Sequence, residues 1–130
     1  MRALGSIDIS STLHSKWNTT DYQKIARFIL GPKYNLSIVL IADTKAHTLN
    51  KKHRKKDYAT NVLTFPLDDT HAEIFLTIPK IRREAATFGL TPQGHAKFLL
   101  IHGCLHLIGY SHGSTMEGAE NKLVAKFNIR

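Results

Sequence analysis

The stretch His102-Gly-Cys-Leu-His106-Leu-Ile-Gly109-Tyr-Ser-His112 places three histidines within eleven residues. An α-helix turns about 100° per residue, so His102 and His106 lie about 40° apart on one helix face, one turn from each other. Gly109 offers the left-handed conformation that commonly ends a helix, and the chain can then fold back to bring His112 to the same point. The spacing therefore predicts one metal ion bound by three imidazoles.

Neutral imidazole suits zinc best among the common cellular ions, and three protein ligands leave a fourth position open, as in catalytic zinc sites. Nickel, or another divalent ion such as cobalt or iron, is compatible with the same ligands. The spacing matches the long zincin motif. That motif carries Glu directly after its first histidine as general base, whereas this chain has Gly103. The pattern thus predicts a metal site without the peptidase base.

Length and composition predict a single domain over residues 1–130. The net charge of +8 favours a polyanionic partner, either nucleic acid or an anionic membrane. Cys104 is the single cysteine, which excludes an intrachain disulfide and indicates a reducing compartment; we expect it to fill the core, facing away from the metal. We see neither a bilayer-spanning apolar run nor a secretory signal, so we expect a cytoplasmic chain with no membrane span and no disulfide-linked partner. The oligomeric state has no signature in the sequence.

Hydropathy patterns predict an α+β fold in which a small mixed β-sheet of about four strands packs with helices. The expected strands cover residues 4–10, 36–42, 61–65 and 72–78, with Pro66 ending the third and a hairpin joining the last two. Helices are expected from Thr20 to Gly31, from Asp43, from Pro79 to Phe88, from Pro92 through the histidines, and from Ser114.

A basic run covers residues 51–56, where five of six residues are Lys or Arg. Such a run has two interpretations: a solvated surface loop, or a set of phosphate contacts. In a chain of net charge +8 we keep RNA contact as a hypothesis for Lys51, Lys52, Lys55 and Lys56.

Two blocks together resemble the bacterial YbeY family, the single-strand-specific endoribonucleases of ribosomal RNA maturation. One is HGCLHLIGYSH at residues 102–112; the other comprises Leu49-Asn50, Arg54, Asp57 and the TNVLTFP segment at 60–66. Ile74 after Glu73, Glu84-Ala85, and Met116-Glu117 with Glu120 also resemble family residues. The resemblance implies a zinc-dependent hydrolase that acts with ribosomal RNA and the ribosome, in 16S rRNA processing and ribosome quality control. It also implies that His102, His106 and His112 bind the metal and that Arg54 acts on the substrate.

Two positions depart from the family pattern. Ser111 stands where the family usually has Asp before the third histidine, and Ala72-Glu73 stands where it usually has Gly-Asp. Serine orients an imidazole or accepts a proton more weakly than a carboxylate does. The motif offers no obvious general base, and Glu73, Asp57, His71 and His95 are candidates by residue type alone. His95 lies seven residues before His102, so it is expected either beside the metal ligands or in the core with a hydrogen-bonded ring.

Two other functions compete with an RNA hydrolase. The first is a non-catalytic ribosome assembly factor that binds ribosomal RNA through its basic face and carries a structural zinc; Gly103 and Ser111 both favour it. The second is a zincin-type peptidase or small-molecule hydrolase, which Gly103 and the positive charge disfavour.

Overall fold

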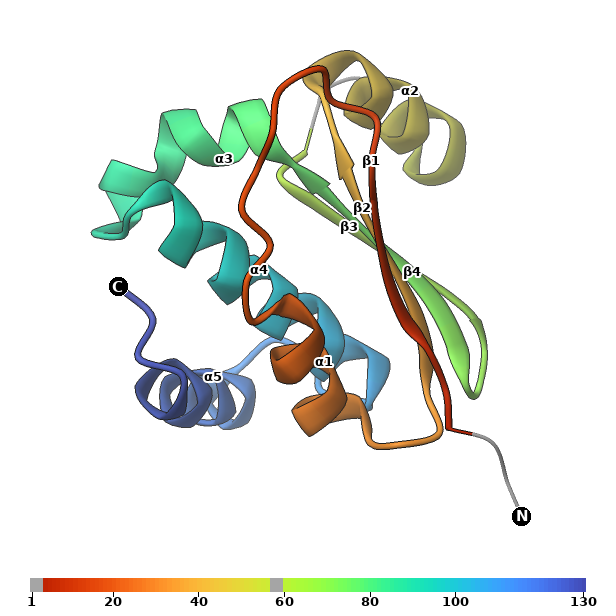
Figure 1. The fold of residues 1–130 in the computed structure, drawn as a ribbon, viewed down its shortest axis with the longest axis vertical. Coiled ribbons are helices and arrows are strands. Elements are labelled where there is room, and N and C mark those ends of the chain that lie inside the picture. Colours follow the sequence, from red (N-terminus) through yellow and green to blue (C-terminus); the bar gives the residue numbers. More distant parts are fainter. Residues whose placement is uncertain (1–3, 57–59) are drawn as a thin grey trace.

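A four-stranded mixed sheet forms the centre of the computed structural model, which describes residues 4–56 and 60–130 (Figure 1). The strand order is β1-β2-β4-β3, with bounds β1 Ile7–Ser11, β2 Asn35–Ile41, β3 Val62–Asp68 and β4 His71–Thr77. The first three strands in this order run parallel, and β3 pairs antiparallel with β4 as the predicted hairpin. The α+β class with a mixed sheet is thereby confirmed.

The helices are α1 Tyr22–Leu30, α2 Asp43–Arg54, α3 Ile78–Glu84, α4 Pro92–Leu107 and α5 Ser114–Lys126, and a short 3₁₀ turn (η1), Ala85–Phe88, follows α3. Helix α4 crosses one face of the sheet, α1 packs against both α4 and β1 on that face, and α5 packs against α4 (Figure 1). Helix α2 lies at the end of the sheet where β2 finishes. In the part of the chain that the structure describes, no helix is both long and apolar enough to cross a bilayer.

Helix α4 is the central helix because it has almost no polar face. Its buried residues lie on all sides of the helix, from Gly94 to Leu105, as expected for a helix enclosed by other elements. Thr91 caps its first turn, accepting a hydrogen bond from the Gly94 N–H at 3.0 Å, and Pro92 occupies the first turn as predicted. Cys104 is fully buried in this core, and burial raises the pKa of its thiol. The expectation that it fills the core is confirmed.

Gly103 lets α4 approach the sheet closely. A Cβ at this position would lie 2.9 Å from Thr64 Oγ1 on β3 and 3.0 Å from Ile74 Cδ1 on β4. The position that carries the general base in zincin peptidases therefore faces packed side chains here and has no room for a carboxylate. Steric exclusion, and not merely a missing functional group, argues against the peptidase hypothesis.

One detail of the predicted elements is wrong. Strand β3 continues through Pro66, which pairs with Ala72, and does not end there. This is possible because β3 lies at the edge of the sheet, where a missing N–H costs no ladder bond, and the register shifts just after Pro66. In the basic run, Lys51 to Arg54 form the last turn of α2, and Lys55 ends the helix with φ 55°. Positive charges at that end complement the helix dipole.

A pair of glycine substitutions tests the close approach of α4 to the sheet. Gly103→Leu should lower the free energy of unfolding by about 1–3 kcal/mol, because the side chain meets Thr64 and Ile74. Gly118 on α5 is the matched control: a Cβ there meets nothing within 4 Å, so Gly118→Leu should raise stability by about 0.5–1 kcal/mol. Urea unfolding measures both, and equal effects at the two positions would contradict the packing described.

Candidate metal centre

The three predicted histidines lie together at the end of α4 and in the loop that follows it. Their ligand atoms lie within 4.8 Å of one another, and among the described residues no other group of three or more His, Cys, Asp or Glu side chains meets this condition. The ring centroids of the three pairs are 4.6–5.1 Å apart. Helix α4 ends at Leu107, and Gly109 follows with φ 104°, so the chain folds back to His112 as predicted.

Hydrogen bonds on the far side of two rings fix which nitrogen carries the proton. His102 Nδ1 lies 3.0 Å from Glu120 Oε2, and His106 Nδ1 lies 2.9 Å from the Tyr110 carbonyl oxygen. A carbonyl oxygen and a carboxylate accept hydrogen bonds, so each Nδ1 must donate. In the neutral rings both Nε2 atoms are then unprotonated, with their lone pairs available.

These two Nε2 atoms face each other 3.1 Å apart. Two lone pairs at that distance repel each other unless a cation lies between them. Zinc binds imidazole nitrogen at about 2.0–2.1 Å, so two nitrogens on a tetrahedral ion are separated by about 3.3 Å. The donor set, its tautomers and its spacing therefore fit a divalent metal of the zinc type.

Electrostatics also favour the ligand form of His106. Burial lowers the pKa of this imidazole, and the nearby rings of His102 and His112 act in the same direction. The hydrogen bond to the Tyr110 carbonyl opposes the change without reversing it. His106 is thus held neutral at neutral pH, as metal binding requires.

A cavity of about 560 Å³ opens beside the three histidines. The residues that line it come from the end of α2, from β3 and the segment before it, and from α4 with the following loop: Arg54, Thr60, Asn61, Val62, Thr64, Pro66, His102, His106, Leu107 and His112. Among the described residues no carboxylate lines this cavity. Arg54 is therefore brought to the same cavity as the histidines from a segment about fifty residues earlier in the sequence.

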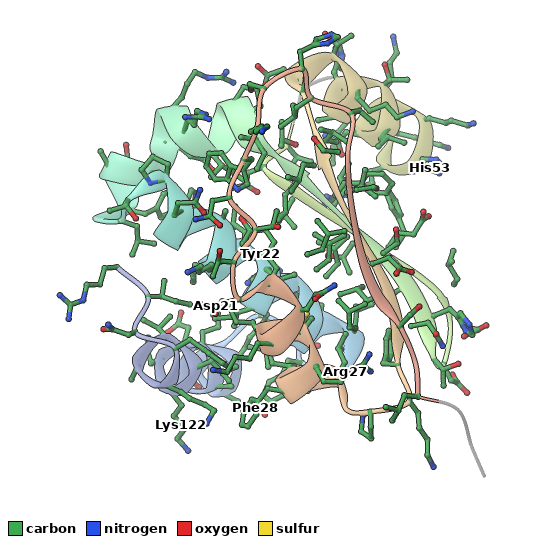
Figure 2. All side chains as sticks on the ribbon, in the orientation of Figure 1. Asp21, Tyr22, Arg27, Phe28, His53 and Lys122 are labelled. Carbon is green, nitrogen blue, oxygen red and sulfur yellow. The ribbon has the colours of Figure 1, made fainter. Side chains whose placement is uncertain are left out.

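The four lysines of the basic run lie apart from the cavity lining. Lys51, Lys52, Lys55 and Lys56 are all exposed around the end of α2. Figure 2 shows His53 beside α2, with Phe28 and Lys122 at the opposite end of the molecule. The basic run thus lies at the end of α2, and Arg54 is its one residue that lines the cavity.

Among the described residues, the candidates for a general base do not line the cavity. His71 bonds Asp68 at 3.0 Å in the exposed hairpin, and Glu73 lines a different hollow. His95 is 2% exposed and bonds Glu84 at 2.9 Å, so it is the core histidine of the two alternatives. Asp57 lies outside the described residues.

The contact between Glu120 and His102 is one that sequence reasoning missed. Glu120 lies 18 residues from His102, on α5, and is 7% exposed. Its position carried a signal: Met116, Glu120 and Leu123 follow helical spacing, which puts a carboxylate in the buried stripe of α5. A charged residue in that stripe needs a buried partner.

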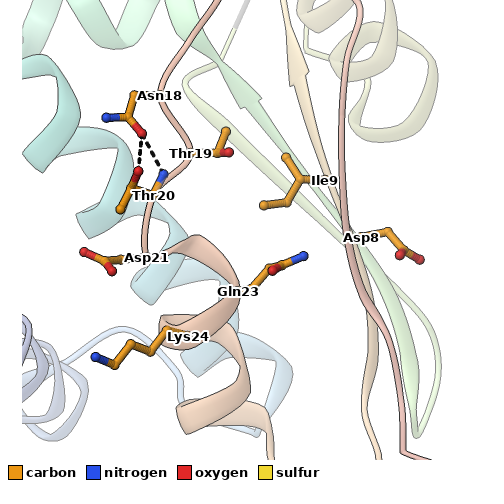
Figure 3. Close-up of a pocket in the computed structure, with 8 residues that line it drawn as sticks. All are labelled: Asp8, Ile9, Asn18, Thr19, Thr20, Asp21, Gln23 and Lys24. Atoms are coloured by element: carbon orange, nitrogen blue, oxygen red, sulfur yellow. Dashed lines mark hydrogen bonds between the residues drawn. The ribbon is translucent and has the colours of Figure 1, made fainter.

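A second hollow of about 680 Å³ lies between α1 and β1, outside the histidine cluster (Figure 3). Its polar side chains partly satisfy one another: Asn18 accepts hydrogen bonds from the Thr20 N–H and hydroxyl groups. Gln23 donates to the Ile7 carbonyl oxygen at 2.8 Å. Among the described residues that line this hollow there is no histidine or cysteine, so it offers no metal site like that of the three histidines.

The fold and site together define an α+β chain with three imidazoles converging on an open, arginine-lined cavity. The sequence profile described as Endoribonuclease YbeY matches residues 6–128. The chain therefore belongs to the YbeY family.

Similar curated proteins carry the same description. One from Stutzerimonas stutzeri (strain A1501), "Endoribonuclease YbeY", is 39% identical over 104 residues, which cover 70% of this chain and 65% of that protein. Another so named, from Methylobacillus flagellatus, is 36% identical over 110 residues, covering 82% of this chain and 74% of the relative. The first match thus spans slightly under two thirds of the relative's length.

A solved structure supports the fold. The solution structure of TM1509 from Thermotoga maritima superposes with a TM-score of 0.70, covering 95% of this chain and 92% of that one at 23% sequence identity. At this identity the likeness concerns the fold alone.

Removal of the Glu120 carboxylate should weaken metal binding. Loss of a carboxylate that hydrogen-bonds to a metal-binding histidine typically lowers metal affinity about 10–100-fold. Glu120→Ala should therefore lower the affinity for zinc by that factor. Glu120→Gln keeps an acceptor for His102 Nδ1 and should lose less. Competition with a chromophoric chelator measures the dissociation constants, and a Glu120→Ala variant with unchanged affinity would show that this bond does not orient the ring.

Proposed function

We propose that this chain is a zinc-dependent, single-strand-specific endoribonuclease of the cytoplasm that acts in 16S rRNA processing and ribosome quality control, with ribosomal RNA and the ribosome as partners. The observation that carries the proposal is the shared cavity of three histidines and Arg54. Membership of the YbeY family and the name of the relatives support the same reaction class.

In this proposal His102, His106 and His112 hold the metal through three nitrogens. When bound, a zinc ion supplies Lewis acidity and activates water near neutral pH; nickel or another divalent ion is compatible with the same donors. Arg54 then binds a phosphate oxygen in two-point contact and balances the charge that develops during attack. Glu120 and the Tyr110 carbonyl hold two of the rings in the required tautomer.

The exposed lysines Lys51, Lys52, Lys55 and Lys56 supply sequence-independent affinity for the phosphate backbone. Each phosphate contact releases a counterion, so binding weakens as salt rises. These lysines are exposed around the end of α2, the helix whose last residue, Arg54, lines the cavity.

A non-catalytic assembly factor that binds ribosomal RNA is the alternative, and two observations favour it. Among the described residues no carboxylate lines the cavity, and Ser111 stands before the third histidine. This alternative predicts tight RNA binding without cleavage.

Cleavage of single-stranded ribosomal RNA by the zinc-loaded chain tests the proposal. Wild-type protein should cut, whereas His102→Ala and a chelated wild-type sample should lose at least about 100-fold in rate, because metal chemistry is removed. Equal cutting by all three samples would reveal a contaminating nuclease. Binding without cutting by the wild type would favour the assembly factor.

Arg54→Ala separates a catalytic role from a structural one. It should lower the cleavage rate about 10²–10³-fold, the usual loss for a group that stabilises transition-state charge, while zinc content and thermal stability stay unchanged. Lys52→Ala is the comparison: it should weaken RNA binding and reduce its salt dependence with little effect on the rate at saturation. Loss of zinc or of folding in Arg54→Ala would contradict the role assigned to Arg54.

A further inference from the structure

A hydrogen-bonded trio connects the cavity wall to the core. Asn61 Nδ2 lies 2.6 Å from Glu84 Oε1, and His95 Nε2 lies 2.9 Å from the same oxygen. Asn61 also lines the cavity of the three histidines. Nothing in the metal chemistry uses these three side chains.

The trio is built to keep Glu84 in place. Burial acts to raise the pKa of Glu84, but the hydrogen bonds from Asn61 and His95 outweigh it and leave the pKa lowered, so the carboxylate is ionised at neutral pH. His95 is 2% exposed and its ring stacks on Phe88, with centroids 4.7 Å apart. Glu84 is thus anchored from the core side.

Hydrogen bonds made by both the backbone and the side chain of Asn61 hold this residue in place. Its carbonyl oxygen accepts from the Thr77 N–H at 2.9 Å, and its Nδ2 donates to Glu84. With the amide nitrogen directed at a carboxylate, the amide oxygen cannot exchange places with it. Asn61 lines the cavity, and among the described residues no hydrogen bond to its Oδ1 is seen. With Nδ2 held by Glu84, Oδ1 is the acceptor that this side chain can offer to a ligand.

We propose that Asn61 Oδ1 accepts a hydrogen bond from the 2′-hydroxyl of the bound nucleotide, with Glu84 and His95 as positioning residues, and that this contact makes the cavity select RNA over DNA. The inference rests on the proposed function and deepens it. Phosphate oxygens are acceptors only, and the 2′-hydroxyl is the one donor that the sugar-phosphate backbone of RNA offers. It stands on the carbon next to the one that bears the 3′-phosphate, and Asn61 lines the same cavity as Arg54 and the three histidines.

Stopped-flow anisotropy with the zinc-loaded chain tests the inference before cleavage proceeds. The probes are single-stranded oligouridylate and oligodeoxyuridylate of equal length and salt, which differ only in the 2′-hydroxyl. Wild type should bind the RNA roughly tenfold more tightly, and Asn61→Ala should lose about that factor for RNA and nothing for DNA. Lys52→Ala, the matched control, should weaken both complexes equally and keep the ratio.

Two variants of Glu84 test its positioning role. Glu84→Ala should reduce the RNA-to-DNA affinity ratio, because the Asn61 amide is then free to turn. Glu84→Gln retains an oxygen that accepts from Asn61 Nδ2, so it should restore the ratio. A merely structural role would lower thermal stability or both affinities without changing the ratio, and that result would overturn the positioning role.

A further experiment uses the wild-type protein alone and replaces single riboses of the RNA by deoxyribose. If no position weakens wild-type binding, or if Asn61→Ala keeps the RNA preference, the inference is overturned while the proposed function stands. The same holds if the effect of Asn61→Ala depends on whether uridine or cytidine oligomers are used, since the acceptor then contacts a base. Wild-type protein that neither binds nor cuts RNA overturns the proposed function, and the inference falls with it.

Discussion

The site depends on one electrostatic constraint, two imidazole lone pairs directed at each other across 3.1 Å. Each ring reaches this state because its other nitrogen donates to a fixed acceptor, Glu120 for His102 and the Tyr110 carbonyl for His106. Without a cation the arrangement is repulsive, and with one it is a chelate. A buried carboxylate and a turn carbonyl thus hold the two rings in the tautomers and positions that a metal ion requires.

The packing of the fold places the three histidines at the wall of an open cavity. Gly103 allows α4 to lie against β3 and β4, so the histidines are close to the residues of β3 that line the cavity. Arg83 of α3 forms a two-point ion pair with Asp43 at the start of α2, with distances of 2.8 and 3.0 Å. That contact ties α2 to the helix that follows the sheet, and α2 delivers Arg54 to the cavity. The elements that line the cavity, α2, β3 and α4, are therefore positioned by these packing contacts.

The local parts of this arrangement could be predicted from sequence, because helical spacing and a following glycine are local properties. Residues 102–112 predicted the cluster, and Thr91-Pro92 predicted the start of α4. The prediction that Pro66 ends its strand was wrong. Whether a proline ends a strand depends on whether the strand lies at the edge of the sheet, which is a property of the tertiary structure. Glu120 and the Asn61–Glu84–His95 trio were missed because their contacts join residues 11–23 positions apart on separate elements. Only the helical position of Glu120 in a buried stripe gave a hint.

X-ray absorption spectroscopy at the metal edge of protein purified without a polyhistidine tag tests the central claim most directly. The account predicts one divalent ion per chain, bound by three imidazole nitrogens at about 2.0–2.1 Å if it is zinc, with an exchangeable oxygen completing the shell. A chain that retains no metal, or an ion with a fourth protein ligand in place of solvent, would contradict it.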